Sequence, residues 1–110
     1  GQPVLIPGDM GTASYVLVGS PNAMTQTWGT TCHGAGRVLS RRKALELTKG
    51  RTIHRDLEDQ GIFVRSAGRN TLREEVPEAY KDVDQVVEVV DGAGLSRRVV
   101  QLKPIGVIKG

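Results

Sequence analysis

A histidine followed at once by a turn of small residues is the feature of this sequence that points most directly to chemistry. Residues 30–37 read TTCHGAGR, with His33 before Gly-Ala-Gly and Arg37 behind it. The backbone N–H groups of such a turn can approach an anion closely, because no large side chains intervene. An imidazole there can act as base, ligand or nucleophile, and a guanidinium can hold phosphate oxygens with its planar fork. Together these groups indicate phosphoryl or nucleotidyl transfer.

The elements that must position this run are predicted from apolar runs and turn residues. Residues 4–6 and 14–18 read as strands, and the polar stretch 19–36 as a long functional loop. The valine-rich segment 83–90 fits a helix or a strand. The other expected elements are a helix at 52–60, a strand at 62–64, a polar loop at 66–73, a helical turn at 77–80, and strands at 98–102 and 105–108.

A helix is expected from about residue 36 to residue 49, with Gly50 as its stop. It would place Arg37 and Arg41 one turn apart on a single face, near an N-terminus that favours anions. A solvated basic surface on an ordinary helix explains the same spacing equally well. The pattern therefore leaves phosphate binding and plain solvation open.

The fold class predicted from these elements is α+β, because strands and helices mix without a regular βαβ rhythm. The long glycine-rich loop would form the active-site loop. With 110 residues and 14 glycines, the chain reads as one unit without internal repeats. Because it opens on Gly1 rather than on methionine, we expect the chain to be a fragment or a processed piece of something longer.

The net charge and the number of cysteines say less about function than the motif at residues 30–37 does. A net charge of +3 is by itself weak support for a nucleic-acid partner. Residues 37–55 nevertheless hold seven lysines and arginines against a single glutamate. The single cysteine excludes an intrachain disulfide, so a reducing, cytoplasmic compartment is expected. No apolar run reaches membrane-spanning length.

Several separated stretches resemble the RtcB-type RNA ligase family. They include the His-Gly-Ala-Gly-Arg run, which is a specific signal when it occurs together with the other stretches. They follow the order expected of the C-terminal part of such a ligase, so the resemblance implies that residues 1–110 are the C-terminal part of a larger catalytic domain. The stretches are PGDMGTASY at 7–15, TCHGAGRVLSR at 31–41, EVPEAYK at 75–81 and LKPIGVIKG at 102–110.

The resemblance implies a reaction. Ligases of this family use GTP and Mn²⁺ to join an RNA 3′-phosphate, or a 2′,3′-cyclic phosphate, to a 5′-hydroxyl end, in tRNA splicing and RNA repair. A histidine, here His33 by motif position, becomes guanylylated and passes the guanylyl group to the RNA 3′-phosphate. The expected partners are tRNA halves or broken RNA, the remainder of the ligase chain and the accessory protein archease. The family's manganese ligands lie upstream, so no metal ligand is expected in this chain.

The resemblance also implies roles for other residues, each with a simpler alternative. Ala35 and Gly36 would contact the nucleotide through their backbone, and Arg37 and Arg41 would bind the guanylate or the RNA phosphate. Four more positions would contact the nucleotide, although each also fits a structural role: Asp9 as a turn residue, Ser14 as a polar strand residue, Tyr80 as a cover for the core edge, and Lys109 as part of a solvated tail.

Three further residues are expected to be structural. His54 has no second ligand at metal-binding spacing and is interpreted as a surface histidine. Cys32 is interpreted as a small, partly buried spacer beside His33. Trp28 can stack on RNA bases, but a single tryptophan in a small domain more often anchors a loop to the core, which we favour.

Two other classes of function fit the same sequence. The chain can be a phosphate- or RNA-binding module without catalysis, which salt-dependent RNA binding without guanylylation would indicate. It can also be a structural fragment that depends on the rest of its chain, which a lack of hydrogen-exchange protection would indicate.

Overall fold

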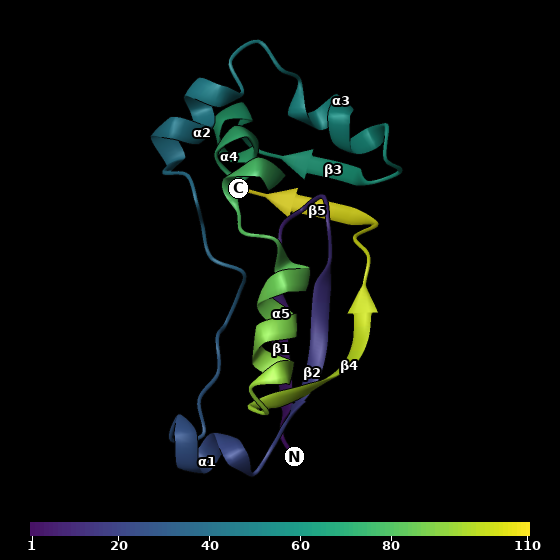
Figure 1. The fold of residues 1–110 in the computed structure, drawn as a ribbon. Coiled ribbons are helices and arrows are strands. Elements are labelled where there is room, and N and C mark those ends of the chain that lie inside the picture. Colours follow the sequence, from purple (N-terminus) through teal and green to yellow (C-terminus); the bar gives the residue numbers. More distant parts are fainter.

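The computed structural model describes residues 1–110, which form two halves stacked along an axis 48 Å long (Figure 1). We call them the α5 half (residues 1–36 and 82–104) and the α4 half (residues 37–81 and 105–110). The α5 half contains β1 (Pro3–Pro7), β2 (Ser14–Gly19), α1 (Asn22–Gln26), α5 (Val83–Gly92) and β4 (Ser96–Leu102). The α4 half contains α2 (Arg41–Leu47), α3 (Ile53–Glu58), β3 (Phe63–Ser66), α4 (Arg69–Glu74), the 3₁₀ turn η1 (Pro77–Ala79) and β5 (Gly106–Lys109).

The α5 half is an antiparallel sheet of order β1-β2-β4 with α5 packed on one face. The segment that fitted a helix or a strand is a helix, because its valines recur at helical spacing and bury one face. The Asp82 side chain caps it by accepting a hydrogen bond from the Asp84 N–H at 2.9 Å. The buried cluster here contains Ile6, Ala13, Tyr15, Leu17, Ala35, Val83, Val87 and Val90.

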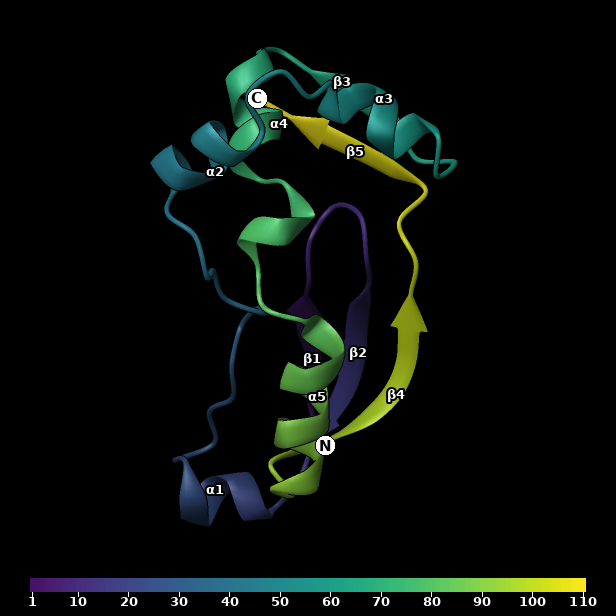
Figure 2. The ribbon, with the colours of Figure 1, turned by 45° about the horizontal axis from the view of Figure 1, so that its top comes forward.

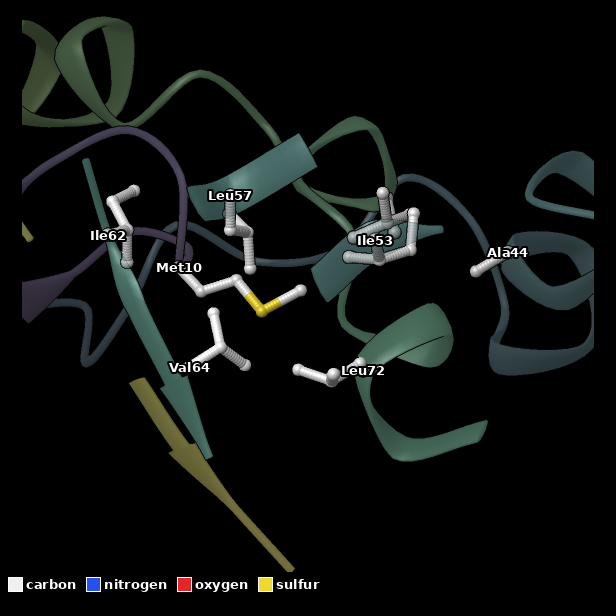
Figure 3. Close-up of a cluster of buried hydrophobic side chains, with 9 residues drawn as sticks. Met10, Ala44, Ile53, Leu57, Ile62, Val64 and Leu72 are labelled. Atoms are coloured by element: carbon white, nitrogen blue, oxygen red, sulfur yellow. The ribbon is translucent and has the colours of Figure 1, made fainter. Parts of the chain in front are cut away.

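The α4 half is a parallel pair of strands, β3 and β5, surrounded by three short helices. Ser40 caps α2 by accepting a hydrogen bond from the Lys43 N–H at 3.0 Å. Its core is a second cluster, shown in Figure 3, of Met10, Ala44, Ile53, Leu57, Ile62, Val64, Leu72, Val76 and Ala79. Residue 10 comes from the other half of the chain.

The β1–β2 loop, residues 8–13, joins the two halves. Figure 2 shows it rising from the three-stranded sheet toward β5, and Figure 3 shows the Met10 side chain among those of Leu57 and Val64. The loop is tight at Gly8, where an added Cβ would lie 2.1 Å from the Ala13 carbonyl oxygen. A side chain is therefore excluded at Gly8, because the two ends of the loop lie close together.

The predicted mixed α+β class is confirmed, with two small sheets and five α-helices. The strands expected near both ends of the chain are present. The predicted helix at 36–49 is wrong over its first residues, because α2 begins at Arg41. Short helices also occupy parts of two segments that we predicted as loops, α1 within 19–36 and α4 within 66–73. No helix has the length and apolar character needed to cross a membrane.

Candidate functional site

Backbone hydrogen bonds connect the run that begins at His33 to both halves of the chain. The Ala35 N–H donates to the Pro7 carbonyl at the end of β1 (3.1 Å). The Lys81 N–H then donates to the Gly36 carbonyl (2.9 Å), and Arg37 pairs with Tyr80 in an isolated antiparallel bridge. The backbone on both sides of Gly36 is therefore fixed by neighbours that are distant in sequence.

The imidazole of His33 is exposed and makes no hydrogen bond within the chain. It borders an open hollow of about 600 Å³, which Thr31 and Cys32 also line. The Thr31 hydroxyl is buried and has no hydrogen-bond partner, so it is available to a bound ligand or water. Cys32 is half-buried against the core of the α5 half, as expected for a spacer. His33 is thus presented as an unengaged nucleophile or base beside an open space.

Arg37 is held by protein groups on several sides. Its Nε donates to the Leu39 carbonyl (3.0 Å), and its Nη2 donates to the Glu74 carbonyl (2.6 Å). Its Nη1 reaches the Glu75 carboxylate (2.9 Å) and the Tyr80 hydroxyl (3.1 Å). The guanidinium carbon also lies 4.9 Å from the centroid of the Tyr80 ring. Four donor contacts leave this guanidinium little freedom to bind a ligand in the present conformation.

Arg37 and Arg41 do not share a helix face, contrary to the prediction. Arg37 lies outside α2, whereas Arg41 is its first residue. The physical reason is a competing pairing: the N–H groups of Val38 and Leu39 both donate to the Ala79 carbonyl (2.8 and 3.2 Å). The backbone before Ser40 is therefore extended against residues 79–81 instead of helical.

Glu75 is the residue around which four of the predicted site residues gather. Burial acts to raise the pKa of its carboxyl. The Tyr80 hydroxyl, which donates to it, and the positive charges of Lys109, Arg37 and Arg41 outweigh burial and lower that pKa. Burial and the neighbouring Glu75 carboxylate raise the pKa of the Tyr80 phenol. Four of the residues predicted to bind nucleotide or phosphate thus gather around one carboxylate of the chain itself.

Sequence reasoning did not select Glu75 as a site residue. It belongs to the EVPEAYK stretch, which carried the family resemblance, but the sequence separation of 38 residues from Arg37 hides the contact. The available signal was the presence of a carboxylate five residues before Tyr80. Such a spacing is common, and it gains meaning only once the fold places Lys109 and Arg41 nearby.

The carboxylate of Asp9 is used within its own turn. It accepts hydrogen bonds from the Gly11 N–H and from the Thr12 hydroxyl, both at 2.9 Å. The Ser14 hydroxyl accepts from the Gly8 N–H at 3.3 Å. Both residues therefore shape the β1–β2 loop, and their contact with a nucleotide stays a prediction.

Trp28 does not anchor its loop to the core, contrary to our interpretation. Its side chain is 88% exposed, and its backbone adopts a φ of 52°, which is rare for a residue with a side chain. The loop is held instead by hydrogen bonds between Thr27 and Thr30. His54 is at the surface, where it contacts Glu58 one turn further along α3.

The residues of this chain do not form a metal centre. No three His, Cys, Asp or Glu side chains gather closely enough to hold a metal ion. The donor set that Mn²⁺ prefers is therefore not assembled here, and no chemical step of this chain is assigned to a metal.

Gly36 needs the conformational freedom of glycine, because its φ is +81°. An added Cβ would meet nothing closer than 3.9 Å, so the cost of a side chain is backbone strain alone. We expect Gly36→Ala to lower the free energy of unfolding of the protein by about 1–2 kcal/mol. Denaturant titration measures it.

The matched control is Gly92→Ala, because Gly92 lies in α5 and an added Cβ there has open space. Alanine at this helical position should be neutral or stabilise by up to about 1 kcal/mol. Equal effects of the two substitutions would contradict the strain that we assign to Gly36.

Glu75 should make the stability of the protein depend on pH on the acid side. Because its pKa is lowered in the folded protein, its stabilising contribution is present at neutral pH and is lost as pH falls through that lowered pKa. We expect Glu75→Gln to reduce the loss of unfolding free energy between about pH 5 and pH 3. A wild-type slope that the substitution leaves unchanged would contradict the assignment.

The chain is similar to known proteins over its whole length. The family model described as "tRNA-splicing ligase RtcB" matches residues 1–110. A tRNA-splicing ligase RtcB of Methanopyrus kandleri is 58% identical over 109 residues, which cover 99% of this chain and 11% of the relative. Those of Pyrococcus abyssi and Archaeoglobus fulgidus are 56% and 54% identical over the entire chain, which covers 12% and 23% of their lengths. The chain therefore spans less than a quarter of these relatives.

Proposed function

Since this chain belongs to the tRNA-splicing ligase RtcB family, we propose that it supplies the guanylylated histidine and part of the guanylate pocket of an RNA ligase. The complete ligase joins RNA 3′-phosphate or 2′,3′-cyclic phosphate ends to 5′-hydroxyl ends and consumes GTP. The nucleophile is His33. The observation that carries this proposal is an exposed, unengaged imidazole beside a turn of bare backbone that both halves of the chain hold in place.

The proposed reaction is a series of group transfers at phosphorus in which no atom changes its oxidation state. An imidazole nitrogen of His33 attacks the α-phosphorus of GTP, so that a nitrogen–phosphorus bond forms as the bond to pyrophosphate breaks. An oxygen of the RNA 3′-phosphate, which a 2′,3′-cyclic phosphate first yields when water breaks its bond to the 2′-oxygen, then displaces the histidine and accepts the guanylyl group. The 5′-hydroxyl finally attacks the activated phosphate, loses its proton and releases GMP.

The chain's contribution to these steps is position and charge, because phosphoryl-type transfers depend mainly on geometry and electrostatic stabilisation. Arg41 and Lys109 lie near Glu75 but form no ion pair, so they are the cations free to bind phosphate. Arg37 keeps Tyr80 and Glu75 in place beside them. The backbone of Ala35 and Gly36 adjoins His33 and would lie against the nucleotide.

The test is to locate the covalent intermediate. The complete ligase is incubated with Mn²⁺ and GTP labelled at the α-phosphate, quenched under alkaline conditions that preserve nitrogen–phosphorus bonds, and digested for mass spectrometry. We expect a GMP adduct on the peptide that contains His33. An adduct on another residue, or labelling that depends on RNA, would contradict the proposal.

A second function is favoured by one observation. The α4 half contains 12 of the 15 lysines and arginines but 7 of the 12 acidic residues, and no metal centre accompanies them. A chain of this length could therefore bind RNA phosphates without reacting. Binding of RNA that weakens steeply with salt, in a complete protein that forms no GMP adduct, would favour this module over the ligase.

A further inference from the structure

A second hollow, which unlike the one at His33 is lined by arginines, lies in the α4 half. It encloses about 600 Å³, and three of its ten lining residues are hydrophobic. None of its lining residues also lines the hollow at His33, and none of its lining side chains bonds to the Glu75 carboxylate. Its polar side chains include Arg51, Thr52, His54, Ser66, Arg69 and Arg73.

Two of its arginines are not neutralised by any carboxylate. Arg69 and Arg73 are four residues apart on α4 and therefore share one face of that helix. Arg69 is exposed and has no hydrogen-bond or ion-pair partner. Arg73 donates from Nε to the Thr48 hydroxyl (3.2 Å) and from Nη2 to the Leu45 carbonyl (2.5 Å). These two bonds fix its guanidinium and leave Nη1 free for an anion.

Arg51 adds a third positive charge, although it has acidic neighbours. It pairs with Glu78 and, at 3.2 Å, with Asp56. The side chains of all three residues are between 39% and 46% exposed. Ion pairs as exposed as these are weak, so a phosphate oxygen can replace a carboxylate oxygen at Arg51 without a large loss.

The hollow runs alongside α4, and the opposite end of that helix leads into the Glu75 cluster. The six residues of α4 span about 9 Å at 1.5 Å per residue. A strand of RNA whose terminal phosphate lies at Arg41 and Lys109 can therefore reach Arg69 with a phosphate further along its backbone. The α4 half as a whole carries 12 lysines and arginines against 7 acidic residues, which favours the approach of RNA to this half.

We infer that this hollow binds a backbone phosphate of the substrate RNA, at a position removed from the end that is joined. The inference rests on the proposed ligase function. Arg69 and Arg73 supply the charge, and the hydroxyls of Thr52 and Ser66 add polar contacts. The site recognises the phosphodiester group and no base, so it increases affinity for RNA of any sequence.

The test uses the complete ligase with Arg69→Gln, with Arg69→Lys as the conservative variant. Arg97→Gln is the matched control, because Arg97 is an exposed arginine of β4 without a hydrogen-bond partner. Steady-state ligation is measured with RNA ends extended by about ten nucleotides and with ends of two nucleotides. GMP-adduct formation is measured in parallel, in the absence of RNA.

We expect Arg69→Gln to raise KM for the extended RNA about 3- to 10-fold without changing kcat, and to reduce the slope of log affinity against log salt by about one. Arg69→Lys should restore most of the affinity, and Arg97→Gln should match the wild type. If Arg69→Gln leaves KM for the extended RNA unchanged while the GMP adduct still forms normally, the RNA site is overturned and the ligase proposal is not affected. An equal rise in KM for the two-nucleotide ends would also overturn it. Absence of the adduct in the wild type would overturn the ligase proposal itself.

Discussion

Replacing His33 by alanine in the complete ligase should abolish both GMP-adduct formation and RNA joining. A methyl group cannot form the nitrogen–phosphorus bond, and loss of the nucleophile from a group-transfer enzyme typically costs about 10⁴-fold or more in rate. Because His33 is exposed and makes no hydrogen bond within the chain, the substitution should leave the fold unchanged. Single-turnover labelling with GTP measures the first step, and ligation of a pre-activated RNA measures the last step.

His54→Ala is the control for this experiment. His54 is the second of the chain's two histidines and lies on α3, where its side chain is exposed and bonds to Glu58. It should retain wild-type labelling. The decisive measurement is the rate of the last step. His33→Ala should still join an RNA that already carries the guanylyl group. Labelling that persists in His33→Ala would remove the basis of the proposed function.

Replacing Arg37 by alanine should destabilise the protein more than any other single loss of charge in the site. The change removes four hydrogen bonds and leaves the Glu75 carboxylate, whose side chain is 18% exposed, without its ion pair. Half-buried charged groups that lose their partner typically cost about 2–4 kcal/mol. Denaturant and thermal unfolding of the complete ligase should show this loss.

Arg42→Ala serves as the matched control, since Arg42 forms an exposed ion pair with Glu46 on α2. Its side chain is 90% exposed, and pairs of this kind contribute about 0.5 kcal/mol or less. Arg37→Lys keeps the charge but cannot reach the carbonyls of Leu39 and Glu74 together with Glu75, so its effect should be intermediate. A loss for Arg37→Ala as small as that for Arg42→Ala would contradict the bonding that we describe.

The strands were predictable because their signal is local. Short apolar runs bounded by proline and glycine identified β1 and β2, and the helical spacing of valines allowed α5. α4 was missed because its sequence RNTLRE buries only Leu72, which gives no apolar periodicity. Its helical state comes from packing against α2 and β3, which no local pattern reveals.

The candidate site divides in the same way. The motif at 31–37 was visible in the sequence because its residue types and spacing suggest a chemistry. The start of the neighbouring helix was misplaced, because backbone pairing with Ala79 overrides the helix propensity of residues 36–40. Glu75 and the lysine and arginines near it come from three separate stretches of chain. Trp28 is exposed, although a single tryptophan in a small domain is usually buried. These features depend on tertiary contacts and needed the structure.

The side chain of Met10 makes the β1–β2 loop sensitive to oxidation. The thioether lies in the core of the opposite half and so anchors the loop from Gly8 to Ala13 to that core. Oxidation of the sulfur to a sulfoxide would force a polar oxygen among Leu57 and Val64 and expel the loop. If the proposed guanylate pocket includes Asp9 and Ser14, oxidation of a buried methionine would then weaken nucleotide binding by displacing the loop that carries them.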